Sequence, residues 1–201
     1  MAPRNLGPLK VVLNGRNVGR LTKAASGAVA FRYDRVWLDW EYALPVSLSL
    51  PLREQAYSGA QVINVFDNLL PDNNDIRLHV AEQASADGVD AYSLLYAIGR
   101  DCVGALQFLP SDAEHQFYEP GHIETAPITD LEIERLIRNL KRAPLGLGAN
   151  SEFRISIAGV QEKTALLRQG GRWRVPLGAT PTTHILKPAI GRLENGLDLR
   201  L

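Results

Sequence analysis

The chain has 201 residues, 45% of them hydrophobic and 22% charged, which is the composition of a globular protein and excludes disorder over its whole length. Its 22 basic and 22 acidic residues cancel, so no overall charge draws it to nucleic acid or to a membrane surface. A single cysteine, Cys102, excludes an internal disulfide and is typical of a reducing compartment, so the expected location is the cytoplasm.

The start of the chain predicts short strands. Residues 9–33 contain three β-like segments separated by turn residues, which indicates an antiparallel meander. Residues 36–43 are compatible with a helical turn or with a strand, and the two tryptophans in this segment are expected to anchor the core. Residues 47–52 are predicted to be extended and to end at Pro51.

Helices are predicted next, because apolar residues recur at helical spacing. In the first of them Val62, Val65 and Phe66 fall on one face, and Pro71 marks its end. The last of them stops at a glycine. The predicted helices cover residues 61–71, 75–84 and 91–99, and a strand follows over residues 103–109.

A polar stretch rich in turn-forming residues, 110–126, indicates a domain boundary. On this basis we expect a β-rich and helical subdomain, then a linker, then a second part of the chain. The predicted limits are 1–112 for the subdomain, 113–126 for the linker and 127–201 for the second part.

The second part opens with a helix and continues with strands. Thr129 and Glu132 form a capping box at the start of an amphipathic helix over residues 130–142. A hairpin turn is predicted at residues 169–171. Helices and antiparallel strands in separate stretches make the fold class α+β. The predicted strands cover residues 152–158, 163–169, 171–177 and 183–188.

The segment FRISIAGVQEKTALL, residues 153–167, holds the residues best suited to phosphate binding. Two β-like stretches flank the loop AGVQE, which contains Gly159. A phosphate site needs inward-pointing N–H groups, no obstructing side chain and a nearby cation. Gly159 permits close approach of the backbone, and Lys163 and Lys187 supply positive charge. The loop matches neither common glycine-rich phosphate motif, so an ordinary hairpin with an exposed lysine remains the alternative.

Several blocks of the sequence together resemble the HipA family of serine/threonine protein kinase toxins. In that family's order, they are YALPVSLSLPL, FDNLLPD, AIGRDCVGALQFLP, FRISIAGVQEKTALL and TPTTHILKP. The resemblance runs from about residue 9 to residue 199. It implies the N-terminal portion of a two-lobed kinase, in which a small β-rich and helical subdomain precedes part of a kinase-like N-lobe with antiparallel strands.

The resemblance also implies roles for particular residues. Ser156 matches the family's autophosphorylation site, where modification expels the loop and silences the kinase. A phosphate at this serine adds roughly −1.5 to −2 charges at pH 7 and would repel the phosphates of ATP. The implied cofactor is ATP with Mg²⁺. The residues implied to bind it are Ala158, Gly159, Val160, Gln161, Glu162, Lys163 and Lys187.

Motifs that would move a phosphoryl group do not occur in these 201 residues. There is no HxD-type catalytic loop and no DFG-type metal motif, and the four histidines lack the spacing of a metal site. We therefore expect no catalytic residue and no metal ligand here, and no activity of the chain alone, since the complete ATP site needs a C-terminal lobe. The acidic residues that match structural blocks of the family instead are Asp67, Asp72, Asp75 and Asp101.

Two functions stay open. The first is an enzyme part, from a kinase that phosphorylates a protein, in the best-known branch a glutamyl-tRNA synthetase. The second is a non-catalytic module, residues 1–112, that binds a kinase or a second copy of itself, although the ATP loop and Lys187 count against it. The resemblance implies a HipB-type antitoxin as partner, contact with DNA only through that antitoxin, and a role in bacterial persistence; a homodimer is compatible with it. No membrane partner is expected, because no apolar run approaches the roughly 20 residues that span a bilayer.

Overall fold

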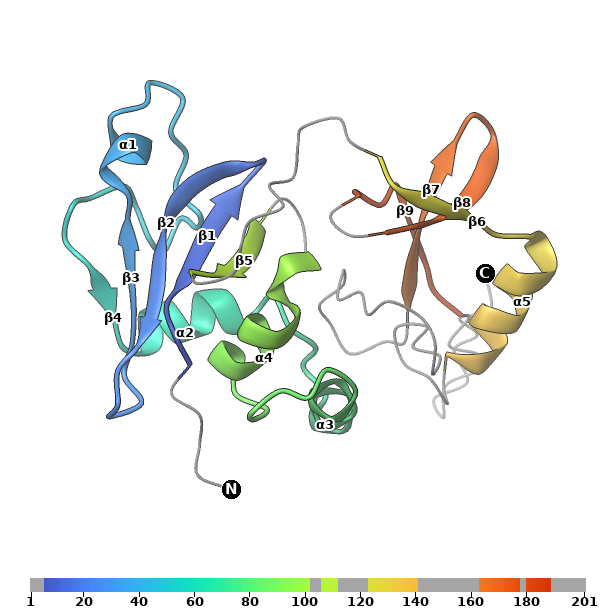
Figure 1. Ribbon diagram of the computed structural model, residues 1–201, viewed down its shortest axis with the longest axis horizontal. Coiled ribbons are helices and arrows are strands. Elements are labelled where there is room, and N and C mark those ends of the chain that lie inside the picture. The colour runs from blue at the N-terminus through green and yellow to red at the C-terminus, as the bar shows by residue number, and fades with distance from the viewer. Residues whose placement is uncertain (1–5, 102–105, 112–122, 141–162, 178–179, 189–201) are drawn as a thin grey trace, which may run out of the picture. The chain divides into compact units, whose positions relative to one another are not determined.

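The structure is a computed structural model, and its described residues gather into two compact units (Figure 1). The first unit contains the described residues up to 111, and the second contains those from 123 onward. Each unit has its own antiparallel sheet and at least one helix, which confirms the α+β class. The described residues are 6–101, 106–111, 123–140, 163–177 and 180–188.

The first unit is built on a five-stranded antiparallel sheet with strand order β4-β3-β2-β1-β5. The first three strands form the predicted meander, and β5 closes the sheet beside β1. The strands are β1 (Leu9–Leu13), β2 (Arg16–Lys23), β3 (Val29–Tyr33), β4 (Tyr57–Ser58) and β5 (Leu106–Pro110).

The three predicted helices of the first unit are present, but the first of them ends at Asp67 rather than at Pro71, with turns and a bend over residues 68–70. The side chain of Asn73 accepts from two backbone N–H groups at the start of α3, and Asp90 does so for the N–H of Ser93 in α4. The segment that was compatible with a turn or a strand is the short helix α1, capped by Asp34. The helices are α1 (Arg35–Leu38), α2 (Ala60–Asp67), α3 (Asn74–Gln83) and α4 (Ala91–Ile98), which the 3₁₀ turn Gly99–Asp101 extends.

Helices α2 and α4 contact one face of this sheet, and the core lies between the sheet and these helices (Figure 1). Three phenylalanines join the layers: Phe31 of β3, Phe66 of α2 and Phe108 of β5 are all buried. Their rings meet edge to face, with centroids 5.4 Å apart for the first pair and 5.3 Å for the second. Because the side chains of a strand alternate, the residues between the core positions point to the other face.

Two local expectations are wrong. Trp37 is buried, but Trp40 is only half-buried and packs against the guanidinium of Arg16, 4.4 Å from its ring centroid. Residues 47–52 form turns and bends rather than an extended segment, and the N–H of Leu50 donates to the carbonyl of Ser47 at 2.9 Å.

A buried tyrosine explains the turn. The hydroxyl of Tyr33 donates to the carbonyl of Leu50 and accepts from the N–H of Val46 at 3.0 Å. Burial raises the pKa of Tyr33 to about 12, so its hydroxyl keeps its proton and can donate. The contact joins β3 to a segment 17 residues later, and a local sequence pattern does not report such a partner.

The second unit contains a four-stranded antiparallel sheet, ordered β6-β8-β7-β9, and one described helix. The capping box is confirmed: Thr129 and Glu132 exchange their hydrogen bonds, and those bonds lower the pKa of Glu132. Gly170 and Gly171 form the predicted hairpin turn, both with positive φ, at 57° and 77°. The elements are β6 (Thr125–Pro127), α5 (Asp130–Asn139), β7 (Thr164–Gln169), β8 (Arg172–Pro176) and β9 (His184–Leu186).

Some predicted features fall outside the described residues. They are most of the predicted linker and the strand predicted over residues 152–158. The last two linker positions, Thr125 and Ala126, are already part of β6. In the parts of the chain that the structure describes, no helix is both long and apolar enough to cross a membrane.

Candidate phosphate-binding strands

Strands β7 and β9 bring Lys163 and Lys187 to the same end of one ladder. Thr164 is paired with Leu186 in this antiparallel register. Lys163 precedes Thr164 and Lys187 follows Leu186, so the two lysines are the next opposed positions where the strands leave the sheet. Residues 24 positions apart in the sequence therefore lie beside each other. This arrangement is the one that a phosphate site built from lysines on neighbouring strands requires.

The two lysines differ in their surroundings. Lys163 is only 3% exposed and takes part in at least one polar or ring interaction. Lys187 is exposed. A buried ammonium must be paired to stay charged at low cost, whereas an exposed ammonium is available to an incoming anion. Lys187 is therefore the residue of this pair that is accessible to phosphates, and Lys163 is the one held in place.

Alternation along the strands places an apolar surface beside the lysines. Ala165 and Ile185 are paired, and each is two residues from a lysine on its own strand, so all four share one face of the sheet. Ile185 is 53% exposed although it lies in a strand. An apolar side chain next to a cation suits a ligand with a flat ring and a charged group.

Ile185 was not singled out from the sequence. The signal that finds it is its position two residues before Lys187 in a short strand, which puts both on one face. Its apolar character alone predicts a buried position, and the structure shows the opposite.

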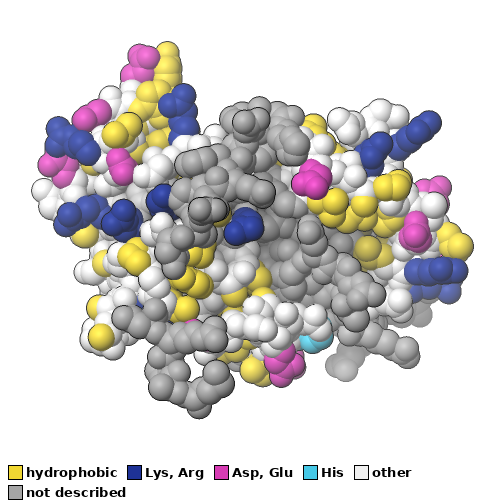
Figure 2. Space-filling view, viewed as in Figure 1, with side chains coloured by type: hydrophobic (Ala, Val, Ile, Leu, Met, Phe, Trp, Pro, Cys, Tyr) yellow, Lys and Arg dark blue, Asp and Glu magenta, His cyan; other side chains and the backbone are white. Residues whose placement is uncertain are grey.

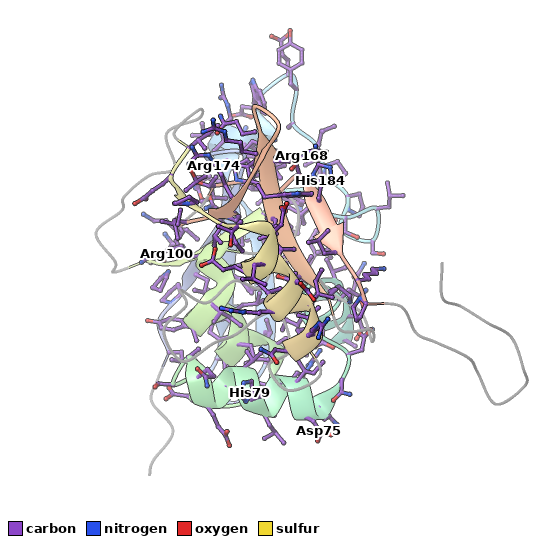
Figure 3. The ribbon with its side chains drawn as sticks, turned by 90° about the vertical axis from the view of Figure 1, so that its right-hand side faces the viewer. Asp75, His79, Arg100, Arg168, Arg174 and His184 are labelled. Carbon is purple, nitrogen blue, oxygen red and sulfur yellow. The ribbon has the colours of Figure 1, made fainter. Side chains whose placement is uncertain are left out.

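The opposite face of this sheet has a different character. The guanidinium of Arg168 lies 5.4 Å from the ring centroid of Trp173, and Trp173 meets His184 edge to face at 4.9 Å. Figure 3 shows Arg168 and His184 next to each other at one end of the sheet. Thr183 accepts from the backbone N–H of Arg168 at 2.8 Å, which ties β7 to the residue before β9. These contacts stabilise the hairpin from the face opposite to the lysines.

The remaining predicted site residues lie outside the described residues, so the structure does not place them. They are Ser156 and the loop residues Ala158, Gly159, Val160, Gln161 and Glu162.

Two of the acidic residues that match family blocks, Asp67 and Asp75, contribute to the stability of the first unit. Asp67 pairs with Arg77 at 2.8 Å, and Asp75 lies in the first turn of α3, where a negative charge suits the helix dipole. Within the described ranges, no three histidine, cysteine, aspartate or glutamate side chains are close enough together to hold a metal ion. Figure 3 labels Asp75 and His79, which both belong to α3.

Comparison with known proteins identifies the family. Residues 9–109 match the family model described as the HipA N-terminal domain. A putative kinase, Y4mE of Sinorhizobium fredii, is 36% identical over 187 residues, which are 92% of this chain and 44% of that protein. The serine/threonine-protein kinase toxin HipA of Shewanella oneidensis is 28% identical over 181 residues, covering 89% of this chain and 39% of the toxin.

A solved structure agrees with these matches. It is the Shewanella oneidensis MR-1 toxin–antitoxin complex of HipA, HipB and operator DNA, and one of its chains aligns with a TM-score of 0.65 and 27% identity. The alignment covers 88% of this chain and 39% of the solved chain. The chain thus spans about two fifths of the length of the relatives it matches. The family model covers half of the sequence, including the first four strands of the first unit and most of β5. The chain therefore belongs to the HipA family.

Proposed function

We propose that these 201 residues supply the N-terminal portion of a HipA-type serine/threonine protein kinase, including part of its ATP site. The observation that carries the proposal is the register of β7 and β9, in which Thr164 opposes Leu186 and so sets Lys163 beside Lys187. A strand lysine directed at nucleotide phosphates is a recurring part of kinase sites. The kinase relatives support ATP as the cofactor.

The residues have separate roles in this proposal. Lys187 binds the phosphates of ATP as a mobile, accessible cation, and Lys163 fixes the end of the loop formed by residues 158–162. Ile185, which is 53% exposed, offers an apolar side chain for the ring of the nucleotide, whereas Ala165 beside it is buried. ATP with Mg²⁺ supplies the phosphoryl group, and in this proposal the ligands of the metal ion come from a catalytic lobe.

Binding of ATP is the first test. Replacing an accessible cation that touches phosphate removes a charge-assisted bond of roughly 1.5–3 kcal/mol, or about tenfold or more in affinity. We expect Lys187→Gln to weaken Mg·ATP binding by this factor in calorimetry. Arg100→Gln, which removes a positive charge from an exposed side chain of the first unit, is the matched control. Equal affinities in all three proteins would refute the proposed site.

Phosphoryl transfer is the second test. The proposal assigns no catalytic residue to these residues, so the purified chain with Mg·ATP is expected to phosphorylate neither Ser156 nor an added protein. Addition of the C-terminal lobe of a HipA-type kinase as a second polypeptide is expected to produce phosphorylation of Ser156, detected by mass spectrometry. Phosphorylated Ser156 from the chain alone would overturn this assignment.

A HipB-type antitoxin is the proposed partner, and the cytoplasm the proposed location. The support is the structural relative, which is a complex of HipA with HipB and operator DNA. In this proposal DNA is reached through the antitoxin. The substrate is a protein, with a glutamyl-tRNA synthetase as the first candidate to assay. Phosphorylation of that synthetase by the reassembled kinase, and its absence with Lys187→Gln, is the expected result.

A second candidate function is a non-catalytic interaction module, and exposed apolar side chains in the segment 36–52 of the first unit favour it. The segment begins in α1, and its most exposed apolar members are Leu48, at 94%, and Val36, at 80%. Apolar side chains that stay exposed on a folded domain can mark a site of partner binding. The other exposed apolar side chains of the segment are Tyr42, Leu44 and Leu52.

Co-purification tests the module. If the exposed apolar side chains of residues 36–52 form the contact with the partner, Leu48→Glu is expected to abolish binding to a HipA-type kinase, or self-association. The affinity for Mg·ATP is expected to stay unchanged. If Leu48→Glu changes neither kinase binding nor self-association, these exposed side chains give the module no support.

A further inference from the structure

The outer face of the first sheet carries a row of basic residues. Lys10 of β1 is directly opposite Arg20 of β2, and Arg20 is directly opposite Arg32 of β3. Opposed residues of an antiparallel pair project from the same face with Cβ atoms about 4.5–5.5 Å apart. Figure 2 shows dark-blue side chains in a line across the strands β3, β2 and β1 on the face turned to the viewer. The helices that cover the core contact the other face.

Among the residues that the structure describes, the two arginines of this row have no partner of opposite charge. Arg20 and Arg32 are both exposed, and neither makes an ion pair or a side-chain hydrogen bond within the described residues. Lys10 does have an interaction partner, so the argument depends on the arginines. Like charges directly opposite each other destabilise a sheet. The pair therefore lowers the stability of the free protein and is relieved when an anion binds between the guanidinium groups.

A groove of about 580 Å³ lies over this row. Arg20 and Arg32 line it together with Thr22 and Asn17, which add hydrogen-bonding side chains. One carboxylate, Asp34, also lines it, but that group accepts from the side chain of Asn17 at 2.9 Å and from the N–H of Val36 at 2.9 Å. The volume is in the range of small-ligand sites, which is roughly 300–1,000 Å³.

The chemistry of the row selects phosphate over other anions. A guanidinium presents donors in a fork that matches two oxygens of one phosphate, and two opposed forks can hold a single group with several acceptor oxygens. A phosphate monoester carries roughly −1.5 to −2 charges at pH 7, enough for both arginines, whereas one carboxylate carries a single charge. The aromatic residues that border the groove, Phe31 and Tyr33, are buried, so the described lining of the groove offers no exposed ring for stacking of nucleic-acid bases.

We propose that Arg20 and Arg32 form a binding site for a small phosphate-bearing molecule on the outer face of the first sheet. Lys10 adds positive charge at one end of the row, and the amide of Asn17, which has a second hydrogen besides the one donated to Asp34, donates to a remaining oxygen. The site belongs to the first unit and is separate in the sequence from the lysines of β7 and β9.

Pyrophosphate is the probe that tests this site. In NMR titrations of the 201-residue chain at constant ionic strength, the backbone amides of Gly19, Thr22 and Ala30 are expected to shift. Each charged hydrogen bond is worth about tenfold or more in affinity, so Arg32→Gln is expected to weaken the titration at these amides by at least that factor. Arg100→Gln, the control in the same unit, is expected to change it less than twofold, and Lys187→Gln is expected to leave it unchanged.

Thermal unfolding in phosphate-free buffer provides an independent readout. Because one of two opposed like charges is removed, Arg20→Gln and Arg32→Gln are each expected to unfold at a higher temperature than the parent, and to gain less from added pyrophosphate. The proposal is overturned if the three amides do not shift, if Arg32→Gln titrates like the parent, or if both variants unfold at a lower temperature. Shifts with a short DNA duplex but not with pyrophosphate would also overturn it, because the row would then be a nucleic-acid surface.

Discussion

At the residue scale, Lys163 and Lys187 differ in burial and therefore in their expected contribution to stability. Both are lysines at the same end of one ladder, yet Lys163 is buried and Lys187 is exposed. Replacement of the exposed lysine by alanine is expected to change the free energy of unfolding by less than about 0.5 kcal/mol. Replacement of Lys163 removes a buried side chain and is expected to cost about 0.5–3 kcal/mol.

Urea denaturation of the two alanine variants measures this difference. If Lys187→Ala proves the more destabilising of the two, Lys163 does not hold the end of the loop, and the division of roles between the lysines is wrong.

Asp90 makes a prediction about pH at the same scale. It caps α4 and pairs with Lys23 at 3.0 Å. Burial alone would raise its pKa, but the hydrogen bonds from Ser93 and Lys23 outweigh burial and lower it. A carboxyl with a lowered pKa stabilises the folded state above its unfolded pKa, and this stabilisation is lost as the pH falls through the folded pKa. Asp90→Ala is expected to cost about 1–2 kcal/mol at pH 7, from the lost cap and ion pair.

The cost of Asp90→Ala is expected to shrink below about pH 4, where the parent carboxyl becomes protonated. Denaturant unfolding of both proteins at pH 7 and pH 3 gives the comparison. Asp90→Asn serves as a control that keeps a capping side chain without the charge. An equal cost of Asp90→Ala at both pH values would show that the charge contributes nothing.

The β7–β8 hairpin gives the clearest prediction at the scale of an element. Gly171 has a φ of 77° with no neighbour within 4 Å of an added Cβ, so the strain of a substitution there comes from the backbone alone. Gly171→Ala is expected to cost about 1 kcal/mol in unfolding free energy. Gly7→Ala, at a position with equal space and no positive φ, is the control and is expected to change little. Equal effects would show that the turn relaxes to another conformation.

The elements that the sequence predicts well are those with local causes. The capping box at Thr129, the hairpin glycines and the helical spacing of Val62 and Phe66 all act within a few residues, and all are present. The turn at residues 47–50 was not predictable in this way, because it depends on the hydroxyl of Tyr33. The exposure of Ile185 likewise depends on which strands pair, and spacing alone does not give the pairing.

The candidate site was predicted in part. Spacing and charge indicated two lysines on neighbouring strands, and the register of β7 and β9 supplied the side-by-side arrangement. The row of basic residues on the first sheet was not predicted, since a net charge of zero does not say where along the chain or on which face the charges lie. Such a row becomes visible only when the antiparallel register of β1, β2 and β3 is known.

At the scale of the whole molecule, the two compact units predict separable folding. The described strands and helices of the first unit all lie within the residues up to 111, and the matched family model covers residues 9–109. A polypeptide of residues 1–111 is therefore expected to fold alone and to unfold in one cooperative transition. Circular dichroism during urea denaturation tests this. A broad, uncooperative transition would show that the first unit needs the rest of the chain.

Hydrogen exchange with and without Mg·ATP tests the central claim, that β7 and β9 carry part of a kinase ATP site. The account predicts slower exchange of the amides of residues 163–165 and 185–187 when Mg·ATP is present. It also predicts that this protection is lost in Lys187→Gln and kept in Arg32→Gln. Protection that is absent from these residues, or that persists unchanged in Lys187→Gln, would contradict the account.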